Sequence, residues 1–325
     1  MASDKQGTAI EPTNGRWSSI NGAFRKGILL ATSNRLVSAG VQRFGMRMGA
    51  ANYVAGETLD ECIQTLKTLT DRGFHSNTTL LGEHIEDEGM ASDVASEYIR
   101  ILDRIHAEEC RTNIALKLTH LGLDLGEEVA YRNVERIVTH ARSLGNFIRI
   151  DMEESDRVDP TLRIYRRLRA EGLENVGTVL QSYLYRTDED LSCLLSLKPN
   201  LRIVKGAYLE PEGVAYPEKA DVDRKMVEQV ETLLENDCYA GIATHDERII
   251  DYFKAYAARH EIGRDRFEFQ MLYGIRTQYQ QELLDEGYKV RIATPFGPEW
   301  YPYLMRRLAE RPANLLFLAK NVVRG

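Results

Sequence analysis

Eight short runs of β-branched and apolar residues recur along the chain, and a stretch with helical periodicity follows each of them. The runs are 78–83 (TTLLGE), 114–118 (IALKL), 147–152 (FIRIDM), 178–183 (TVLQSY), 201–208 (LRIVKGAY), 241–245 (GIATH), 267–272 (FEFQML) and 289–295 (KVRIATP). Neighbouring runs are separated by the length of one helix and two short loops, which is the pattern of repeated βα units. Eight such units in a chain of 325 residues predict a distorted TIM-type (βα)8 barrel.

The helical stretches have recognisable boundaries. We expect helices that open at Ser92, Pro160 and Thr187, and helices over 127–144, 221–236, 246–259, 276–285 and 298–311. An open doubly wound sheet is the alternative arrangement of alternating strands and helices. Such a sheet usually carries a GxGxxG turn when it binds a dinucleotide, and this sequence has none. The barrel is therefore favoured.

The overall composition excludes several classes of protein. A formal net charge of -7 argues against nucleic acid as a partner. No apolar run approaches the roughly 18 residues of a membrane span. The four cysteines are widely separated and form no CxxC pair, which is typical of a reduced cytoplasmic protein without a metal cluster or disulfide framework.

The N-terminal region has a different charge balance from the rest. Residues 12–56 contain six cations and no carboxylate. One interpretation is that residues 16–50 contact an anionic membrane surface, at the inner face of the cell membrane. The other is a helical arm that packs on the domain. We expect residues 1–15 to be disordered, residues 16–72 to form the N-terminal helical arm, and residues 73–325 to form the catalytic barrel.

Polar side chains gather at the ends of the predicted strands, where a barrel builds its active site. They are Glu83, Lys117, Asp151, Gln181, Arg202, Lys205, Thr244, His245 and Gln270. A buried ion costs several kcal/mol unless it is paired or used, so chance placement of so many is disfavoured. Individually, Lys117 could extend its ammonium to solvent and His245 could be a core histidine. Together the set predicts an anionic ligand that forms many hydrogen bonds.

Three other kinds of site are alternatives for such a mouth. Asp151, His120 and His245 could supply metal ligands, but no HxH or HExxH spacing brings two of them together. The nearby cations would also repel a metal ion, so we expect no metal site. Lys117 or Lys205 could form a Schiff base, as in a lyase or aldolase. A barrel that binds a ligand without catalysis is the third reading.

The segment YPYLMRRLAE, residues 301–310, puts Tyr303, Arg306, Arg307 and Glu310 on one face of a helix. A solvated helix with an i,i+4 ion pair is the simplest explanation. However, the segment follows the eighth strand directly, so the helix is expected to lie over the barrel mouth with this face toward a ligand.

With these features assembled, the sequence resembles the monofunctional bacterial proline dehydrogenases over residues 55 to 322. The motifs that carry the resemblance are AGET, IALKLTHLGL, FIRIDMEES, TVLQSYLYR, LRIVKGAY, YPEK, GIATHD, FEFQMLYGIR and the YxxRRxxE pattern of 303–310. The resemblance implies a (βα)8 barrel that holds FAD noncovalently. It implies oxidation of L-proline to Δ1-pyrroline-5-carboxylate, the first step of proline catabolism to glutamate, with electrons passed to a membrane quinone.

The resemblance also assigns roles around the substrate. Arg306 and Arg307 would clamp the proline carboxylate with planar guanidiniums, Lys117 would add a third positive charge, and Glu310 would orient an arginine from behind. The ring would pack against Tyr303 and Leu272. Two positions carry the chemistry: Asp151 would work in a network with Lys117 and Tyr208, and Arg202 would stand near flavin N5, where a cation stabilises the reduced, anionic flavin.

The positions that match FAD contacts form a second group. They are Met152, Gln181, Arg202, Val204, Lys205, Gly206, Ala207, Lys219, Thr244 and His245. Gly206 is expected because a missing Cβ lets the backbone approach a flat ring or a phosphate. Thr244 and His245 precede a helix start, which suits a pyrophosphate or adenine contact.

One position departs from the family pattern. The eighth strand of the family usually reads Tyr-x-Pro-x-Gly, whereas this chain has Ala293, Pro295 and Gly297. The missing ring is expected to enlarge the proline pocket and remove a hydroxyl. This predicts weaker binding of proline, or acceptance of a substituted ring such as 4-hydroxyproline.

Overall fold

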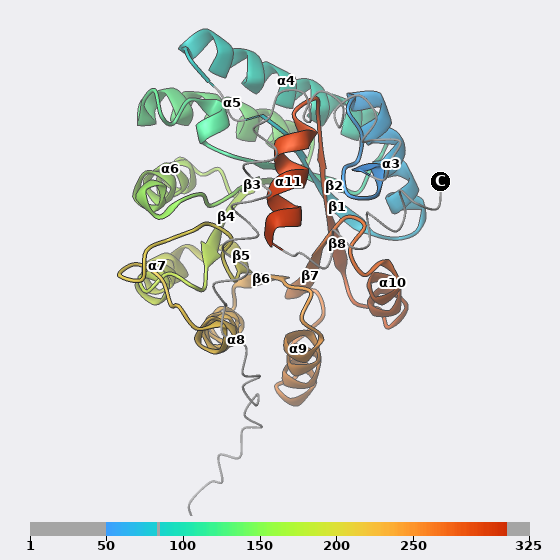
Figure 1. Cartoon of the computed structure of the whole chain (residues 1–325), viewed down its shortest axis with the longest axis vertical. Helices are drawn as coiled ribbons and strands as arrows, with labels where there is room; N and C mark the ends of the chain where they lie inside the picture. The colour runs from blue at the N-terminus through green and yellow to red at the C-terminus, as the bar shows by residue number, and fades with distance from the viewer. Residues whose placement is uncertain (1–49, 83–84, 311–325) are drawn as a thin grey trace, which may run out of the picture.

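Eight parallel strands pair in chain order, and β1 pairs with β8 to close the barrel (Figure 1). The computed structural model describes residues 50–82 and 85–310, and for residues 306–310 it describes the backbone alone. The strands are β1 (His75–Leu80), β2 (Thr112–Leu116), β3 (Ile148–Ile150), β4 (Val176–Gln181), β5 (Asn200–Val204), β6 (Tyr239–Ala243), β7 (Phe267–Leu272) and β8 (Val290–Phe296). This closed sheet confirms the predicted (βα)8 barrel.

Helices surround the sheet as an outer ring (Figure 1). They are α3 (Leu59–Asp71), α4 (Glu88–Ala107), α5 (Glu127–Ser143), α6 (Val158–Ala170), α7 (Thr187–Leu194), α8 (Lys219–Glu235), α9 (Glu247–Arg259) and α10 (Thr277–Asp285). Short 3-10 turns complete the connections: η1 (Ala50–Asn52), η2 (Thr119–Leu121), η3 (Ser155–Arg157) and η4 (Leu195–Leu197). Each long helix buries one face; in α4, Tyr98, Leu102 and Ile105 are fully or almost fully buried at helical spacing.

The last helix, α11 (Trp300–Glu310), lies across the barrel instead of in the outer ring (Figure 1). Its residues Trp300 and Leu304 form a separate buried cluster with Val54, packed against Leu81. Leu81 directly follows β1, so this cluster stands at the carboxyl ends of the strands. The helix over the mouth was predicted from its place after the eighth strand.

Helix α3 takes the outer-ring position that the final helix leaves open, because it packs against both β1 and β8. Its start is well defined: Thr58 accepts a hydrogen bond from Glu61 N and the Glu61 carboxylate accepts one from Thr58 N, which is a capping box. Just before it, Ala55 N donates to Pro295 O at 2.8 Å. The segment before β1 therefore both seals the barrel wall and borders the mouth.

Several element boundaries differ from the prediction for local reasons. α4 begins at Glu88 rather than at Ser92, because Asp87 accepts the hydrogen bond of Met90 N at 2.9 Å and caps the helix. Thr187 is the first residue of α7 and not its cap, since its hydroxyl donates to Gln181 O at 2.6 Å. Most of the predicted strands are shifted toward the C-terminus relative to the observed ones. Their predicted ends include polar motifs that in the structure lie in the loops after the strands.

Among the described helices, none is both long and apolar enough to span a membrane. The expected disordered residues 1–15 and most of the proposed arm, residues 16–49, lie outside the described residues, as does Glu83.

Trp300 is the main anchor of α11. It is 1% exposed, and its Nε1 donates to Glu57 Oε1 at 2.5 Å. Trp300→Ala should remove about 3–5 kcal/mol of packing between α11 and the barrel. Because α11 has its own small core, we expect amide exchange in residues 300–310 to accelerate while exchange in the strands stays slow. Trp300→Phe, which keeps most of the volume, is the control. Equal acceleration in the barrel strands would show that α11 is not an independent unit.

Candidate active site

An ion pair stands at the centre of the barrel mouth. Arg202, from the middle of β5, donates from Nη1 to Asp151 Oδ1 at 2.7 Å, and Asp151 directly follows β3. Their side chains are 11% and 25% exposed, so the pair is largely shielded but open on one side. Asp151 contacts Arg202, and the network expected for Asp151 with Lys117 and Tyr208 stays a prediction. The two predicted catalytic positions are therefore in direct contact.

Gln181 ends β4 beside this pair. Its amide Nε2 donates to Glu153 O at 3.2 Å, while its buried Oε1 has no hydrogen-bond partner among the described residues. A buried carbonyl without a donor costs free energy, so this oxygen is poised to accept a hydrogen bond from a ligand.

Glu153 is a buried carboxyl that the sequence interpretation overlooked. It accepts hydrogen bonds from Thr119 N at 3.1 Å and from Thr119 Oγ1 at 2.6 Å. Burial raises its pKa, and the hydrogen bonds of Thr119 and the charge of Lys117 only partly offset that rise. Lys117, one residue beyond β2, thus acts electrostatically on Glu153. In the sequence, the only signal for Glu153 was its place in the FIRIDMEES motif.

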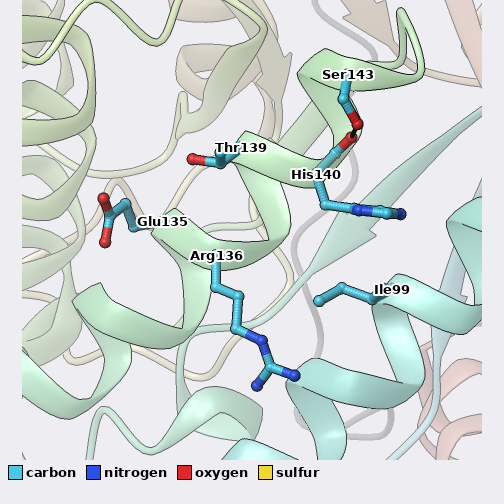
Figure 2. A pocket seen from close by; sticks show the side chains of 6 residues that line it. All are labelled: Ile99, Glu135, Arg136, Thr139, His140 and Ser143. Atoms are coloured by element: carbon cyan, nitrogen blue, oxygen red, sulfur yellow. Dashed lines mark hydrogen bonds between the residues drawn. The ribbon is translucent and has the colours of Figure 1, made fainter.

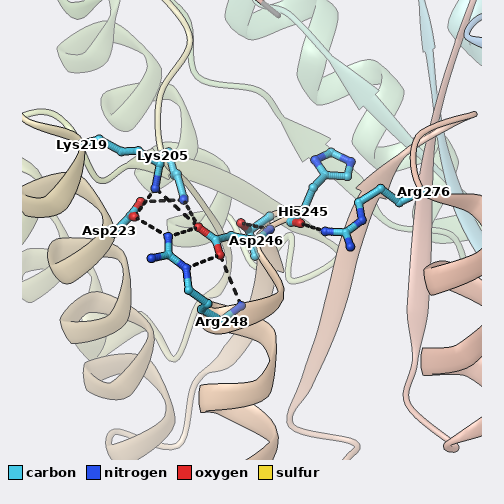
Figure 3. A network of polar contacts seen from close by, with 8 residues as sticks. Lys205, Lys219, Asp223, His245, Asp246, Arg248 and Arg276 are labelled. Atoms are coloured by element: carbon cyan, nitrogen blue, oxygen red, sulfur yellow. Dashed lines mark hydrogen bonds and ion pairs between the residues drawn. The ribbon is translucent and has the colours of Figure 1, made fainter. Parts of the chain in front are cut away.

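A cluster of three cations and two carboxylates joins β5, α8 and α9 at the mouth (Figure 3). We call Lys205, Lys219, Asp223, Asp246 and Arg248 the mouth cluster. Lys205 Nζ lies 2.6 Å from Asp223 Oδ1 and 3.3 Å from Asp246 Oδ2, and Arg248 Nη2 lies 2.9 Å from the same Asp246 oxygen. Lys219 contacts both carboxylates. One positive charge is left over, which suits an anionic ligand.

Asp246 is the hub of the mouth cluster and also the N-cap of α9, accepting from Arg248 N at 3.3 Å. Burial alone would raise the pKa of Asp246. The hydrogen bonds and charges of Arg248 and Lys205 outweigh this effect and hold the pKa well below its usual range. The carboxylate is therefore a fixed anion at neutral pH.

The β5–α8 loop carries other predicted cofactor positions. Val204 O and Lys205 O accept hydrogen bonds from Ser182 N and Tyr183 N at 2.8 and 2.9 Å, which ties the start of the loop to the end of β4. Gly206 has φ +113°, and a Cβ there would lie 2.3 Å from the Tyr183 ring. The ring of Tyr183 therefore requires glycine at this position, and the approach of the Gly206 backbone to a cofactor stays a prediction. Ala207 and Tyr208 follow in the same loop, beyond the end of β5.

The remaining predicted cofactor positions lie around the rim. Met152 is buried just after β3, Lys219 opens α8, and Thr244 is buried after β6. His245 Nε2 accepts the hydrogen bond of Leu272 N at 3.0 Å. The carbonyl of His245 accepts one from Arg276 Nη1 at 2.8 Å (Figure 3). The loop after β6 is thereby fixed to β7.

The predicted substrate residues are described in part. Leu272 ends β7, and Ala293 of β8 pairs with it in register, so the two positions are neighbours. Tyr303 is half-buried in α11. Arg306, Arg307 and Glu310 belong to the same helix, and their side chains lie outside the described part of the chain. The carboxylate clamp thus stays a prediction.

A hollow of about 440 Å³ lies between α4 and α5 on the outer ring (Figure 2). Its lining is mostly polar: His140 Nε2 lies 2.7 Å from Asp103 Oδ1, Arg136 donates to Ser96 Oγ at 2.8 Å, and Ser143 Oγ donates to His140 O at 2.7 Å. It is a groove between packed helices and is separate from the mouth. No group of three or more potential metal ligands occurs among the described residues.

The fold and this site together define a class: a (βα)8 barrel with a charged ligand site at the carboxyl ends of its strands, which is the arrangement of barrel enzymes. The chain matches the proline dehydrogenase family over residues 62–320. It is 43% identical over 310 residues to a proline dehydrogenase of Deinococcus radiodurans, covering 94% of this chain and 100% of the relative. Proline dehydrogenase 1 of Bacillus subtilis is 40% identical over 296 residues, covering 91% and 98%.

The chain therefore belongs to the proline dehydrogenase family, and it is an enzyme that oxidises proline. A solved structure of proline utilization A from Bdellovibrio bacteriovorus, inactivated by N-propargylglycine, has the same fold with a TM-score of 0.76 at 24% identity. The match covers 86% of this chain and 34% of that one.

Asp246→Asn should separate the charge of the mouth cluster from its capping role, because asparagine caps a helix as well as aspartate does. The pKa of Asp246 is lowered in the folded protein, so its stabilisation is complete well above the unfolded value of about 3.9 and is lost as the pH falls. We expect the variant to lose about 1–3 kcal/mol in urea unfolding at pH 7. The deficit should shrink toward pH 3.

Asp87→Asn at the cap of α4 is the matched control, since Asp87 accepts the hydrogen bond of Met90 N in the same way. Its effect should stay below about 0.5 kcal/mol at either pH. A deficit for Asp246→Asn that is constant with pH would mean that charge pairing does not stabilise the mouth cluster.

Proposed function

We propose that this enzyme oxidises L-proline to Δ1-pyrroline-5-carboxylate with FAD, as the first step of proline catabolism to glutamate. The observation that carries the proposal is the shielded Asp151–Arg202 ion pair at 2.7 Å, open to the mouth of a barrel of the proline dehydrogenase family. A bound flavin would supply the acceptor for the hydride that leaves the proline ring.

The mouth has features that fit such a cofactor. The unpartnered Oε1 of buried Gln181 can accept a hydrogen bond from an imide N–H, a group that the flavin ring possesses. The mouth cluster offers Lys205, Lys219 and Arg248 to a diphosphate, beside the N-terminus of α9. On binding, these cations would exchange their carboxylate partners for phosphate oxygens.

The chain's own residues would then orient the substrate and exclude water. Helix α11 covers the mouth through the Trp300 cluster and is expected to bring Arg306 and Arg307 to the proline carboxylate. Leu272 and Tyr303 would hold the ring by shape. Asp151 keeps Arg202 in place, and the guanidinium favours negative charge that develops beside it.

The partners of the reaction are further proposals. The electron acceptor is proposed to be a membrane quinone, and the cationic residues 16–50 are proposed to contact anionic lipid on the inner face of the membrane. Binding to anionic but not to neutral vesicles, lost when residues 1–49 are deleted, would support this contact.

The Schiff-base alternative is less well supported. Lys205 forms ion pairs with two carboxylates of the mouth cluster, and conversion of its ammonium into a Schiff base would break both pairs. The direct test is the visible absorption of oxidised flavin in the purified protein and its bleaching by proline under anaerobic conditions. A colourless protein that is trapped by borohydride with a carbonyl substrate would instead favour the lyase.

Arg306→Ala should raise the KM for proline by about 10- to 150-fold, because a charge-assisted hydrogen bond to the carboxylate contributes about 1.5–3 kcal/mol. The rate of proline-dependent dye reduction, measured over a range of proline concentrations, provides the value. Arg163→Ala, which removes an exposed ion pair with Glu127 on the outer ring, is the control and should leave the KM unchanged. An unaltered KM in Arg306→Ala would remove this residue from the clamp.

Ala293→Tyr should convert the pocket toward the family pattern. Ala293 stands between Asn77 of β1 and Leu272 of β7, so a phenol at this position would narrow the space beside the ring-packing wall. We expect the variant to lower the KM for proline and to raise it for 4-hydroxyproline. Kinetics of both enzymes with both substrates decide the matter, and a wild-type enzyme that already strongly prefers proline would contradict the enlarged pocket.

A further inference from the structure

A continuous chain of polar contacts crosses the inside of the barrel below the mouth. Arg291 of β8 donates from Nε to Glu268 Oε1 at 2.5 Å, and Gln270 Nε2 donates to the same oxygen at 2.6 Å. Gln270 Oε1 accepts from Arg202 Nε at 2.5 Å, and Arg202 reaches Asp151. Arg291, Glu268, Gln270 and Arg202 are each less than 10% exposed. The ion pair at the mouth therefore has a buried extension.

The contact between Gln270 and Arg202 joins two strands that are not neighbours. β6 separates β5 from β7, and its residue Gly241 pairs in register with Arg202 on one side and with Glu268 on the other. A Cβ at Gly241 would lie 2.6 Å from Gln270 Nε2 and 3.5 Å from Arg202 Cα. The absent side chain is the opening through which Gln270 reaches Arg202.

Chemistry at both ends fixes the orientation of the Gln270 amide. Burial alone would raise the pKa of Glu268, but the charge and hydrogen bonds of Arg291 lower it to about 2, so this carboxylate only accepts hydrogen bonds. Arg202 Nε only donates. The amide must therefore turn its NH₂ to Glu268 and its oxygen to Arg202, and the reverse orientation would lose both contacts.

The same contacts decide which Arg202 atom remains for a ligand. Nε is bound by Gln270 and Nη1 by Asp151. In the part of the chain that the structure describes, Nη2 has no recorded hydrogen bond, so it is the donor that can face a bound group. Without Gln270 the guanidinium would keep only the Asp151 contact and could rotate about it.

We propose that Gln270 is a positioning residue, which reaches through the opening at Gly241 and, anchored by Glu268, fixes the Arg202 guanidinium toward the bound cofactor. The effect of Gln270 on the flavin rests on the proposed function, in which Arg202 stabilises the negative charge of reduced flavin. Gln270 itself touches neither substrate nor cofactor in this role. Its effect must appear in the state of Arg202.

Gln270→Met is the direct test, since methionine keeps the length of the side chain and loses both hydrogen bonds. In the full-length protein without flavin, the Arg202 Nε–Hε resonance, assigned by its absence in Arg202→Lys, should exchange with solvent faster than in wild type. In the flavin-loaded enzyme, the equilibrium constant for reduction should fall about tenfold, which is about 30 mV for a two-electron couple. kcat should fall with KM for proline little changed.

Gln229→Met is the matched control. Gln229 is 2% exposed and donates one hydrogen bond, to Asp188 at 2.8 Å, but it lies on α8 outside the barrel. It should change stability without moving the resonance or the potential. An equal shift in both variants, or no shift in Gln270→Met, would overturn the proposal.

Gln270→Glu adds a second measurement, the pH dependence of the flavin potential, which a purely structural role of Gln270 would leave unchanged. Two facing carboxyls share a proton, which raises the pKa of one of them. When protonated, Glu at position 270 can donate to Glu268 and accept from Arg202 as the amide does. The potential should therefore approach the wild-type value as the pH falls and depart from it as the pH rises. A potential offset that is constant with pH would contradict the proposal.

Gly241→Ala tests the opening independently if Gln270→Met fails to fold. The atom that its Cβ would meet is the flexible end of Gln270, so the strand should be retained while the contact is displaced. The signature should match that of Gln270→Met, and an unperturbed Arg202 resonance would overturn the proposal. A wild-type protein that takes up no flavin would refute the proposed function alone, because the Arg202 resonance still reports on positioning.

Discussion

A guanidinium buried inside a parallel barrel must find hydrogen-bond acceptors among strands whose backbone groups are mostly paired across the sheet. Three arginines are buried among the described residues, and two of them, Arg149 and Arg202, find an acceptor on a strand beyond their neighbour. Arg149 of β3 reaches the main chain of Asn200 on β5 at 2.6 Å, and Gln270 of β7 reaches Arg202 on β5. In each case a glycine on the intervening strand, Gly177 or Gly241, leaves the room.

The placement of α11 follows from a second constraint. A helix after β8 normally completes the outer ring, but α3 already covers the seam between β1 and β8. The last helix is therefore free to cross the mouth, where Trp300 and Leu304 give it a small core of its own. Because α3 covers this seam, α11 can lie at the mouth and border the site.

The sequence predicted the barrel and the place of Asp151 and Arg202 at its mouth, because both follow from the periodicity of the strands; it did not predict that these two side chains contact each other. Asp151 and Arg202 stood out as ionisable side chains at the ends of apolar runs. Asp223 and Arg248 did not, because they lie on helices whose amphipathic pattern looks ordinary. Glu268 and Arg291 were visible in the middle of strands, but no sequence pattern says which charges meet across a barrel. Such contacts depend on register and on the gap at Gly241.

The two groups of charges differ in how firmly they are held, and this difference divides their roles. The interior chain is buried, and its contacts lie at 2.5 to 2.7 Å between groups with one possible orientation, so it is suited to fixing geometry. The mouth cluster is partly exposed, and its cations each have more than one carboxylate partner. Such cations can move to an incoming anion without leaving a buried charge unpaired. Arg202 belongs to the interior chain, and it also stands at the mouth beside the mouth cluster. A ligand that rearranges the mouth cluster therefore meets a guanidinium that Gln270 and Asp151 already hold in place.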